Sequence, residues 1–589
     1  MKRKKLIMLP RIKNRKIKNH SPKIIFLGVV FFILWFLVFL RLIQLQIVDY
    51  KKYRVLAENL RIFERTELAE RGLIYTQEKS GQKFPIATNN FSYTLYVVPR
   101  YLSQPEETAA KIALALGVLI DTNDKDYQII LEKVSKSNSW YEILRKNLTL
   151  SEVERIKEYQ IESVGFEKEV ERFYPDNNYF SHILGFIGYQ NHRRLGQYGL
   201  EEYYNNILSG KEGVVRGERS ASQALIPTAS DFLKEPKNGS TLLTTLDRMV
   251  QIKTCDILDK AITNYQAKRG TIIVVEPSTG KILALCNWPN FNLNEYAKVK
   301  NMELYLNNAV SSQYEPGSVF KVITMAAGLE DQKIKPETIF EDKGSVKIGS
   351  HIIKNAADRT YGQVNMRTVL EKSINTGAVF VAQEVGRERF LYWTKKFGFG
   401  EKTDIDLPGE ARGNISNLLE KRDIYLATAS FGHGLAVTPI QMVMSFAAIA
   451  NGGKLMKPYL VQEIISEDTS FKNEAQEIRQ VLSPITAETL KDMMISSVEE
   501  GWGKRAGISG YLVAGKTGTA EIPDLKGYSQ HSVHSFIGFA PADKPKFVAL
   551  VKLDEPAFLR FSDQTAAPVF GELADFLLKH YQIPPSEIK

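Results

Sequence analysis

Cysteine is scarce in this chain of 589 residues, with only Cys255 and Cys286. Two cysteines do not make a disulfide framework in a chain of this size, and Cys286 directly follows the apolar run 281–285, so we expect it to be simply buried. The eight histidines show no metal-binding spacing, because His531 and His534 lack the glutamate of H-E-x-x-H and fall in a segment expected to form a polar loop. The sequence therefore predicts no metal site and no cofactor.

Acidic residues are absent from residues 1–23, which hold ten lysines and arginines. Without these ten, 67 basic residues face 67 acidic ones, so the formal net charge of +10 belongs to this tail alone. A basic arm that binds nucleic acid is one interpretation of such a run. The segment that follows favours a membrane protein instead, and we expect no nucleic-acid partner.

Residues 24–40 form a run of seventeen without a charged or ordinary polar side chain, bounded by Lys23 and Arg41. Such a run is just long enough for a helix to span a hydrocarbon core of about 30 Å. A cleaved signal peptide would have a shorter apolar region and a small-residue cleavage site, which residues 41–46 lack. We therefore predict a transmembrane helix over 24–45, with 1–23 as a cytoplasmic tail and the rest of the chain outside the plasma membrane.

The chain beyond the anchor divides into two predicted parts. Residues 46–236 mix strand-like runs with charged helical stretches and show no catalytic motif, so we expect a pedestal that acts as a spacer or docking module. Residues 237–589 begin with a predicted helix over 247–267 and a hairpin of strands 271–275 and 281–285, and predicted strands return over 511–520, 535–540 and 547–553. This order predicts an α+β domain with an antiparallel sheet flanked by helices.

Three short motifs follow one another in the second part: Ser318-Val319-Phe320-Lys321, Ser373-Ile374-Asn375 and Lys516-Thr517-Gly518-Thr519. The S-x-x-K spacing is weak evidence by itself, because it recurs at Ser80, Ser278 and Ser586. By contrast, S-x-N and K-T-G occur once each. The ordered combination, rather than any single motif, indicates a functional site.

Ser318 is the candidate nucleophile. It follows Pro316-Gly317 and precedes the apolar stretch 319–329, so it should open a helix whose N-terminus favours developing negative charge. Residues three apart share a helix face, which places Lys321 to reach the Ser318 hydroxyl. A lysine acts as a base only when burial or a neighbouring cation lowers its pKa, and Lys516 is the candidate cation. A capping serine beside a solvated lysine is the simpler alternative.

The second motif offers a proton relay and a binding group. It stands between helical stretches 366–372 and 378–385, with a break expected at Thr376-Gly377. Ser373 can relay a proton between a lysine and a leaving group, and Asn375 can hold a substrate amide. An ordinary helix–helix turn would have the same appearance.

The third motif is expected in a strand, where Thr517 and Thr519 share one face and Lys516 points to the other. Lys516 then needs strand twist or its long stem to act in the site. Gly518 leaves the backbone open to an extended peptide. The N–H groups of Thr519 and Ser318 are a candidate oxyanion hole.

Together these residues resemble the class B penicillin-binding proteins, monofunctional peptidoglycan D,D-transpeptidases of the FtsI type. The resemblance extends to Glu315-Pro316-Gly317, Phe397-Gly398-Phe399-Gly400, Asp406-Leu407-Pro408-Gly409 and Phe431-Gly432-His433-Gly434 with Thr438, Pro439 and Gln441. It implies the penicillin-binding-protein and β-lactamase-like fold. It also implies acylation of Ser318 by a stem peptide, with Lys321 as base, Ser373 as relay and Lys516 as electrostatic support. Asn375 would position substrate, and Thr517 and Thr519 would bind its terminal carboxylate.

Two departures from the family pattern stand out. The usual pedestal opening R-G-x-I-x-D-R-x-G is replaced after Arg71-Gly72-Leu73-Ile74 by Tyr75-Thr76-Gln77-Glu78. Gly501-Trp502-Gly503 stands where many relatives have Gly-Thr. We expect differences in pedestal packing and in local loop shape, and no effect on the chemistry.

Several functions remain open. The resemblance favours a septal transpeptidase, with an elongation or sporulation enzyme as alternatives. A β-lactamase, a D,D-carboxypeptidase or a non-catalytic β-lactam sensor fits less well, given the pedestal and the short tail. The expected ligands are peptidoglycan stem peptides or a lipid-linked precursor, with β-lactams as inhibitors. Because no glycosyltransferase module is identifiable, the resemblance implies a separate membrane polymerase of the FtsW type and other divisome proteins as partners.

Overall fold

The computed structural model describes residues 21–121, 123–161, 163–190, 193–218, 231–524 and 527–585. The chain forms two compact units, one of residues 1–68 with 212–236 and the other of residues 69–211 with 237–589. Most of the predicted basic tail (residues 1–20) and Ser586 lie outside the described residues. The predicted boundaries at 23/24, 45/46 and 236/237 stay predictions.

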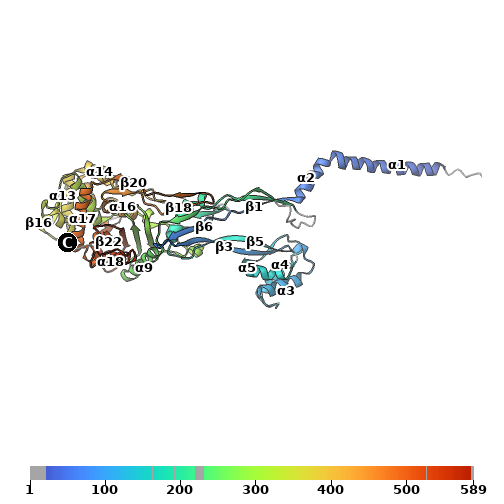
Figure 1. Ribbon diagram of the computed structural model, residues 1–589, viewed down its shortest axis with the longest axis horizontal. Coiled ribbons are helices and arrows are strands. Elements are labelled where there is room, and N and C mark those ends of the chain that lie inside the picture. Colours follow the sequence, from blue (N-terminus) through green and yellow to red (C-terminus); the bar gives the residue numbers. More distant parts are fainter. Residues whose placement is uncertain are drawn as a thin grey trace, which may run out of the picture. The chain divides into compact units, whose positions relative to one another are not determined.

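The first unit contains the apolar helix and a small antiparallel sheet (Figure 1). Helix α1 (Ser21–Ile43) continues through a π-turn, η1 (Gln44–Val48), and is followed by α2 (Tyr50–Arg61). Its apolar segment Pro22–Val48 spans 27 residues, long and apolar enough to cross a bilayer. The sheet has the order β1-β8-β9, with bounds Ile62–Glu67, Gly213–Glu218 and Asp231–Lys234. The predicted apolar helix is thus confirmed.

A mixed sheet in the second unit joins strands from both predicted parts of the chain. Its order is β19-β18-β10-β2-β3-β4, with β5 also paired to β3. Strand β10 runs parallel to β2, with Leu242 opposite Ile74. The strands are β2 (Ile74–Gln77), β3 (Lys83–Val97), β4 (Glu142–Leu148), β5 (Val164–Phe173), β10 (Thr241–Thr244), β18 (Val461–Ile465) and β19 (Ser470–Lys472). The pedestal (residues 46–236) and the predicted catalytic part (residues 237–589) are therefore linked by backbone hydrogen bonds.

Three helices cover one end of this sheet and form a hydrophobic core with it. Figure 1 shows them together beside β3 and β5. They are α3 (Pro105–Leu116), α4 (Lys125–Val134) and α5 (Leu150–Glu158). The short elements that follow are α6 (Ser181–Leu184), β6 (Phe186–Gln190), β7 (Arg193–Gln197), α7 (Gly199–Tyr203) and α8 (Asn205–Leu208).

Glu201, in α7, is a buried carboxylate of the pedestal that forms ion pairs with two arginines. Arg71 Nε and Arg172 Nε donate to its two carboxylate oxygens at 2.6 and 2.7 Å. Burial by itself would raise the pKa of Glu201, but the two arginines outweigh it and hold the pKa below its ordinary range. Removing one partner of such a buried pair is strongly destabilising, by about 3–5 kcal/mol. Arg71, in the part of the pedestal opening that keeps the family pattern, is thus tied to the interior of the pedestal.

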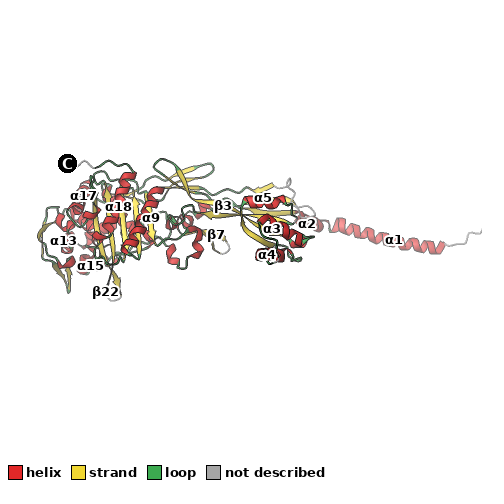
Figure 2. Cartoon of the chain, turned by 90° about the horizontal axis from the view of Figure 1, so that it is seen from below, coloured by secondary structure: helices red, strands yellow, loops and turns green. Residues whose placement is uncertain are grey.

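The catalytic part is built around an antiparallel sheet of order β12-β11-β23-β22-β21. Its strands are β11 (Arg269–Val275), β12 (Ile282–Trp288), β21 (Ala514–Asp524), β22 (Gly527–Ala540) and β23 (Phe547–Asp554). Ile272 and Val274 share a buried cluster with residues of helices α9 (Arg248–Tyr265) and α18 (Ala566–His580). Figure 2 shows these two helices beside the strands of the sheet. Ile273 and Val275 share the other cluster with α16 (Pro439–Ala450). The predicted α+β fold, with an antiparallel sheet between helices, is confirmed.

The remaining elements belong to the part of the chain around this sheet, except for the turn η2, which follows β3. The helices are α10 (Asn308–Ser311), α11 (Lys321–Glu330), α12 (Met366–Glu371), α13 (Asn375–Val385), α14 (Arg387–Lys396), α15 (Asp423–Ala429) and α17 (Pro484–Glu499). Short strands pair as β13 (Ile339–Asp342) with β16 (Gly362–Asn365), β14 (Ser345–Ile348) with β15 (His351–Lys354), and β17 (Lys454–Met456) with β20 (Glu477–Gln480). The 3-10 turns are η2 (Pro99–Tyr101), η4 (Leu293–Lys298), η5 (Met302–Tyr305), η6 (Gly317–Phe320), η7 (Ala356–Asp358), η8 (Ser416–Leu419), η9 (Lys504–Ala506) and η10 (Ser562–Gln564).

The two cysteines form a disulfide, which corrects the expectation that they are unpaired. Cys255 lies on α9 and Cys286 on β12, and their Cα atoms are 5.4 Å apart. The helix packs on the strand that follows the β11–β12 turn, so residues 31 positions apart in sequence meet in the core. The sequence analysis predicted a buried Cys286 and a helix over 247–267, but not that this helix packs on the strand of Cys286.

Candidate active site

Ser318, the predicted nucleophile, lies in the 3-10 turn η6 directly ahead of α11. It lines a cleft of about 880 Å³. Gly317 has a φ of 61°, and a Cβ at this position would come within 2.9 Å of Thr519 O. Only glycine lets the turn approach strand β21 this closely. Ser318 opens a helical segment as predicted, except that its first turn is 3-10 rather than α.

Lys321 is fully buried and joins the first motif to the second. Its Nζ donates to Ser373 O at 2.5 Å, to Ser373 Oγ at 3.1 Å and to Asn375 Oδ1 at 2.7 Å. These acceptors use all three N–H bonds of an ammonium group. Burial, together with the nearby charge of Lys516, holds the pKa of Lys321 well below its ordinary range. This favours the neutral amine that a general base requires.

Ser373 lies in the turn between α12 and α13, with a φ of 55°. The break predicted at Thr376-Gly377 is therefore wrong, because both residues belong to α13. Gly377 is needed instead for close packing, since a Cβ there would come within 2.5 Å of Val369 Cγ1 on α12. The positive φ of Ser373 costs about 1–3 kcal/mol, because Ser373 is not a glycine, and it persists only where the surrounding residues enforce it.

A buried carboxylate that no sequence motif marks anchors this turn. Asp342 accepts hydrogen bonds from Gly344 N at 3.0 Å, Tyr361 N at 2.9 Å, Asn355 Nδ2 at 2.9 Å and Thr376 Oγ1 at 2.6 Å. Burial by itself would raise the pKa of Asp342, but these donors outweigh it and hold the pKa below its ordinary range. Because Thr376 directly follows Asn375, the network fixes the start of α13 and so the second motif.

Lys516 lies on β21, the edge strand of the catalytic sheet, and is fully buried. Strand alternation points its side chain away from those of Thr517 and Thr519, yet its amine reaches Thr517 O at 3.2 Å and Thr517 Oγ1 at 3.3 Å. The long stem thus returns the amine to the cleft side of the strand. Burial lowers the pKa of Lys516 to about 7, and its charge contributes to the low pKa of Lys321.

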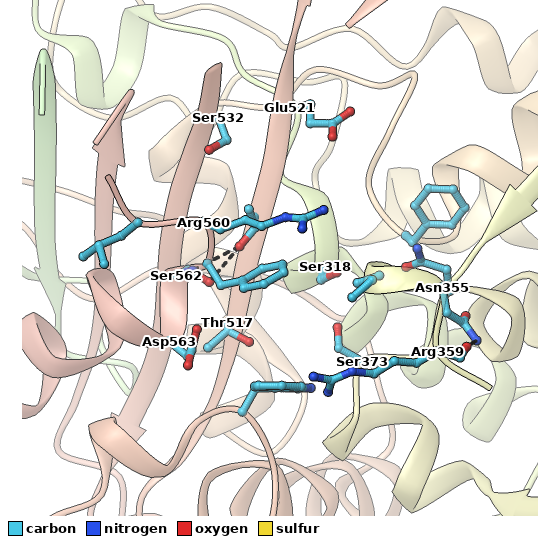
Figure 3. Close-up of a pocket in the computed structure, with 18 of the residues that line it drawn as sticks. Ser318, Asn355, Arg359, Ser373, Thr517, Glu521, Ser532, Arg560, Ser562 and Asp563 are labelled. Carbon is cyan, nitrogen blue, oxygen red and sulfur yellow. Dashed lines mark hydrogen bonds between the residues drawn. The ribbon is translucent and has the colours of Figure 1, made fainter. Parts of the chain in front are cut away.

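Thr517 and Thr519 both line the cleft. Figure 3 shows Thr517 opposite Ser373, with Ser318 between the two sides. Ser562, which the sequence analysis missed, holds the Thr519 hydroxyl: Thr519 Oγ1 donates to Ser562 Oγ at 3.1 Å and accepts from Ser562 N at 3.2 Å. The two residues are 43 positions apart, and no spacing rule links them.

Gly518 lies where turn η6 packs against strand β21. A Cβ at this position would meet Ser535 Oγ at 2.6 Å, Val319 Cγ1 at 2.9 Å and Pro316 O at 3.0 Å. The glycine therefore lets the turn that carries Ser318, the predicted nucleophile, approach β21 closely. Its expected contact with an extended peptide stays a prediction.

Trp502, in the loop Gly501-Trp502-Gly503, lines the cleft. Trp502 N donates to Glu371 O at 3.3 Å, and Trp502 Nε1 donates to Lys372 O at 3.2 Å. The two acceptors belong to the two residues before Ser373. This departure from the family pattern therefore contacts the segment that leads to the second motif, and the expectation that it does not affect the chemistry stays a prediction.

The motifs Glu315-Pro316-Gly317 and Asp406-Leu407-Pro408-Gly409 each contribute a carboxylate that holds loops or strands around the site. Glu315 accepts from Gly434 N at 2.8 Å and from Tyr528 OH at 3.1 Å, which ties the loop before Ser318 to the β21–β22 hairpin. Asp406 accepts from Leu460 N and Val461 N at 2.7 and 2.8 Å. These carboxylates position loops and strands.

No group of three His, Cys, Asp or Glu side chains suited to a metal ion occurs among the described residues. His531 and His534 lie on strand β22, not in a loop as expected. His534 is buried between Ser532 Oγ at 3.0 Å and Thr565 Oγ1 at 2.9 Å, and burial lowers its pKa to about 4. It is a neutral, structural residue.

A serine at the start of a helix, two buried lysines, a serine–asparagine turn and two threonines on an edge strand define a serine acyltransferase site of the penicillin-recognising class. Comparison with known proteins agrees with this class. The model of the penicillin-binding protein transpeptidase domain matches residues 270–575, and that of the penicillin-binding protein dimerisation domain matches residues 66–244. The chain belongs to the penicillin-binding protein transpeptidase family.

Individual relatives cover most of the chain. Stage V sporulation protein D of Bacillus subtilis is 32% identical over 98% of this chain and 88% of that protein. The peptidoglycan D,D-transpeptidase FtsI homolog of Mesostigma viride is 31% identical over 72% of this chain and 75% of that protein. The crystal structure of penicillin-binding protein 2X from Streptococcus thermophilus has the same fold, with a TM-score of 0.77 and 22% identity over 88% of this chain and 80% of that one.

Proposed function

We propose that this chain is a peptidoglycan D,D-transpeptidase that cross-links stem peptides through an acyl-enzyme on Ser318. The observation that carries the proposal is the position of Lys321, whose buried amine contacts both polar residues of the second motif. The names of relatives such as the FtsI homolog support the reaction.

In the acylation step, Lys321 takes the proton of the Ser318 hydroxyl, and the oxygen bonds to the carbonyl carbon of the penultimate D-Ala of a donor stem. The amide bond to the terminal D-Ala breaks, and its nitrogen receives the proton through Ser373. In the second step, an acceptor amine attacks the ester carbon and loses a proton along the same path. A new amide bond forms, the ester bond to Ser318 breaks, and Lys321 returns a proton to the Ser318 oxygen.

The remaining site residues bind and polarise the donor. The side chains of Thr517 and Thr519 receive its terminal carboxylate, Lys516 supplies positive charge, and Asn375 holds a stem amide. For the oxyanion, we propose the N–H groups of Ser318 and Thr519. Thr519 O faces Gly317 at the edge of β21 that no other strand pairs with among the described residues. The N–H and C=O of one strand residue point to the same side, so the N–H of Thr519 is expected at this edge as well.

Covalent labelling by a fluorescent penicillin tests the nucleophile. Ser318→Ala should abolish labelling, whereas Ser80→Ala and Ser278→Ala should not, because these two serines lie outside the cleft although each has a lysine three residues later. Labelling of Ser318→Ala at the wild-type rate would overturn the assignment. Ser586→Ala is a further control.

The product distinguishes a transpeptidase from a hydrolase. With a donor stem, an acceptor amine and a membrane polymerase present, cross-linked stem dimers are expected, and the acyl-enzyme should react only slowly with water. Rapid release of hydrolysed β-lactam, or trimmed stems without cross-links, would identify a β-lactamase or a D,D-carboxypeptidase instead. Failure to form any covalent adduct would favour a non-catalytic protein.

For topology, we propose a single membrane-spanning helix with the N-terminus in the cytoplasm and the catalytic part outside. The disulfide Cys255–Cys286 supports this orientation, because disulfides persist in oxidising compartments and are rare in the cytosol. Protease added to spheroplasts should remove the chain beyond the anchor and spare residues 1–23. A mature protein that begins after residue 45 would mean a cleaved signal peptide.

The cellular role is proposed to be septal wall synthesis, with a membrane glycan polymerase of the FtsW type and other divisome proteins as partners. The name of the Bacillus subtilis relative favours sporulation as a second candidate. Co-purification with the polymerase and enrichment of a tagged protein at division sites of growing cells are expected. Enrichment confined to sporulating cells would select the alternative.

A further inference from the structure

Trp502 is held rigidly on the side of the cleft that carries Ser373. Besides its two hydrogen bonds to residues 371 and 372, the loop receives a return contact, because Lys372 Nζ donates to Glu500 O at 2.8 Å. Gly501 allows this approach, since a Cβ there would come within 2.5 Å of Glu371 O. The indole ring is therefore a fixed part of the cleft wall.

Arg359 rests on the face of this ring. Its Cζ lies 5.0 Å from the ring centroid, within the range of a cation–π contact, and the residue lines the cleft (Figure 3). Its backbone is fixed as well, because Asn355 Nδ2 donates to Arg359 O at 3.1 Å. The aromatic face and the anchored backbone together limit where the guanidinium can go.

The Arg359 guanidinium is exposed to the cleft and has no acid partner within the described part of the chain. The adjacent carboxylate, Asp358, is paired with Lys354 at 3.0 Å. Lys372 adds a second positive charge on the same side, and its amine donates to a backbone carbonyl, Glu500 O, and to no carboxylate of the described residues. This side of the cleft is therefore positively charged before any ligand binds.

The opposite side carries charges of both signs. Glu521 continues the row of Thr517 and Thr519 along the cleft face of β21, two residues beyond Thr519. Asp563 also lines this side, where burial raises the pKa of its carboxyl and so favours its uncharged form, and the exposed Arg560 lines it too. Among the charged residues that line the cleft, the excess of positive charge is therefore larger on the Ser373 side, where Arg359 and Lys372 lie.

We propose that Arg359, supported by Trp502, forms a carboxylate-binding subsite that takes a stem-peptide carboxylate other than the terminal D-Ala carboxylate. The terminal group is assigned to Thr517 and Thr519 across the cleft, so a second carboxylate of the same stem or of the acceptor stem is the ligand that matches Arg359. A stacked guanidinium offers a planar pair of donors to a carboxylate and loses that fit when the carboxylate is amidated. This subsite rests on the proposed function.

Matched peptides test the subsite. Two peptides that end in D-Ala-D-Ala and differ only in one internal carboxylate, free in one and amidated in the other, are used with the full chain in detergent. The donor arm measures how each slows labelling by fluorescent penicillin. The acceptor arm measures how much cross-linked product forms when an amidated peptide is supplied as the donor and each of the two matched peptides serves in turn as the acceptor. Wild-type protein should prefer the free acid about tenfold in one arm, as expected for a hydrogen-bonded charge pair.

Variants separate the subsite from general effects. Arg359→Gln should remove the preference, and Arg359→Lys should restore part of it as a point charge. Trp502→Phe should keep more of the preference than Trp502→Leu, because phenylalanine retains an aromatic face. Arg560→Gln is the matched control: Arg560 also lines the cleft and is exposed, but it lies near Ser562, across from Ser373 (Figure 3). It should keep the full preference.

The outcomes distinguish this inference from the proposed function. A preference in the donor arm assigns the carboxylate to the donor stem, and a preference only in the acceptor arm assigns it to the acceptor. Equal reaction of acid and amide in both arms, or an unchanged preference in Arg359→Gln, overturns the subsite while penicillin labelling still stands. Wild-type protein that is not labelled at all would overturn the proposed function itself.

Discussion

Replacing Lys516 by methionine should weaken acylation of Ser318 and, at neutral pH, raise the free energy of unfolding. The amine supplies positive charge to the cleft and lowers the pKa of Lys321, so its loss should slow penicillin labelling by about a hundredfold, as for removal of one preorganised electrostatic group. Methionine has nearly the same length and shape, so the core position stays filled. Activity and stability should therefore change in opposite directions.

The size of the stability effect follows from the pKa of Lys516. Burial lowers this pKa from an ordinary 10.5 to about 7, so between these values the unfolded chain binds more protons and stability rises with pH. The buried amine costs about 4 kcal/mol at pH 7 and about 2 kcal/mol at pH 9. The advantage of Lys516→Met over wild type should therefore shrink by about 2 kcal/mol between pH 7 and pH 9.

Urea unfolding of the full chain in detergent, followed by tryptophan fluorescence at both pH values, measures this difference beside the labelling rate. Lys552→Met is the matched control, because Lys552 is a buried lysine on strand β23 of the same sheet and is paired with Asp554. It should lose stability, since it leaves a carboxylate without its partner, and keep labelling. A Lys516→Met variant that loses stability at pH 7, or whose advantage does not change with pH, would refute the reasoning.

Three further changes test other parts of the structure. Asp342→Ala should cost about 3 kcal/mol or more in unfolding free energy, because it leaves four buried donors without an acceptor, and should slow penicillin labelling; a folded variant labelled at the wild-type rate would contradict the link from Asp342 to Ser373. Gly518→Ala should cost about 1–3 kcal/mol through overpacking against Val319 and Pro316 and should slow labelling, whereas equal rates would show that the turn can move without loss. Cys255→Ser should lower the unfolding free energy by about 3–4 kcal/mol, since the disulfide closes a loop with a sequence separation of 31, and wild type with added reductant should unfold like the variant; identical midpoints with and without reductant would argue against the bond.

Features that depend on neighbouring residues could be predicted from the sequence. The apolar helix, the β11–β12 hairpin and the helix after Asp247 each follow from a local pattern of apolar residues, turn residues or caps. Asp247, for example, caps α9 by accepting from Met249 N and Val250 N. The candidate site was also recognisable, because its three motifs are short and stand in a fixed order.

Features that depend on distant residues could not be predicted from the sequence. The Asp342 network, the contact of Ser562 with Thr519 and the disulfide all join segments whose approach only the folded chain defines. Glycine depends on distant neighbours in the same way. Gly377 was interpreted as a helix break, but it lies inside α13 and packs against Val369. Gly518 was interpreted as open backbone, and the sequence did not show that Val319 and Pro316 pack against it. A sequence shows that a Cβ is missing, but not which neighbour occupies the space.

The same distinction explains why the S-x-x-K spacing alone indicates so little. Ser80 and Ser278 also have a lysine three residues later, but Lys83 is exposed and Lys281 is only partly buried. At Lys321, the contacts from Ser373 and Asn375 hold the amine in place, and by themselves they would favour its charged form. Burial and the charge of Lys516 act against that form. The second motif therefore fixes where the amine is, and the third helps to set whether it carries a proton. A base at Ser318 requires both, so neither motif can replace the other.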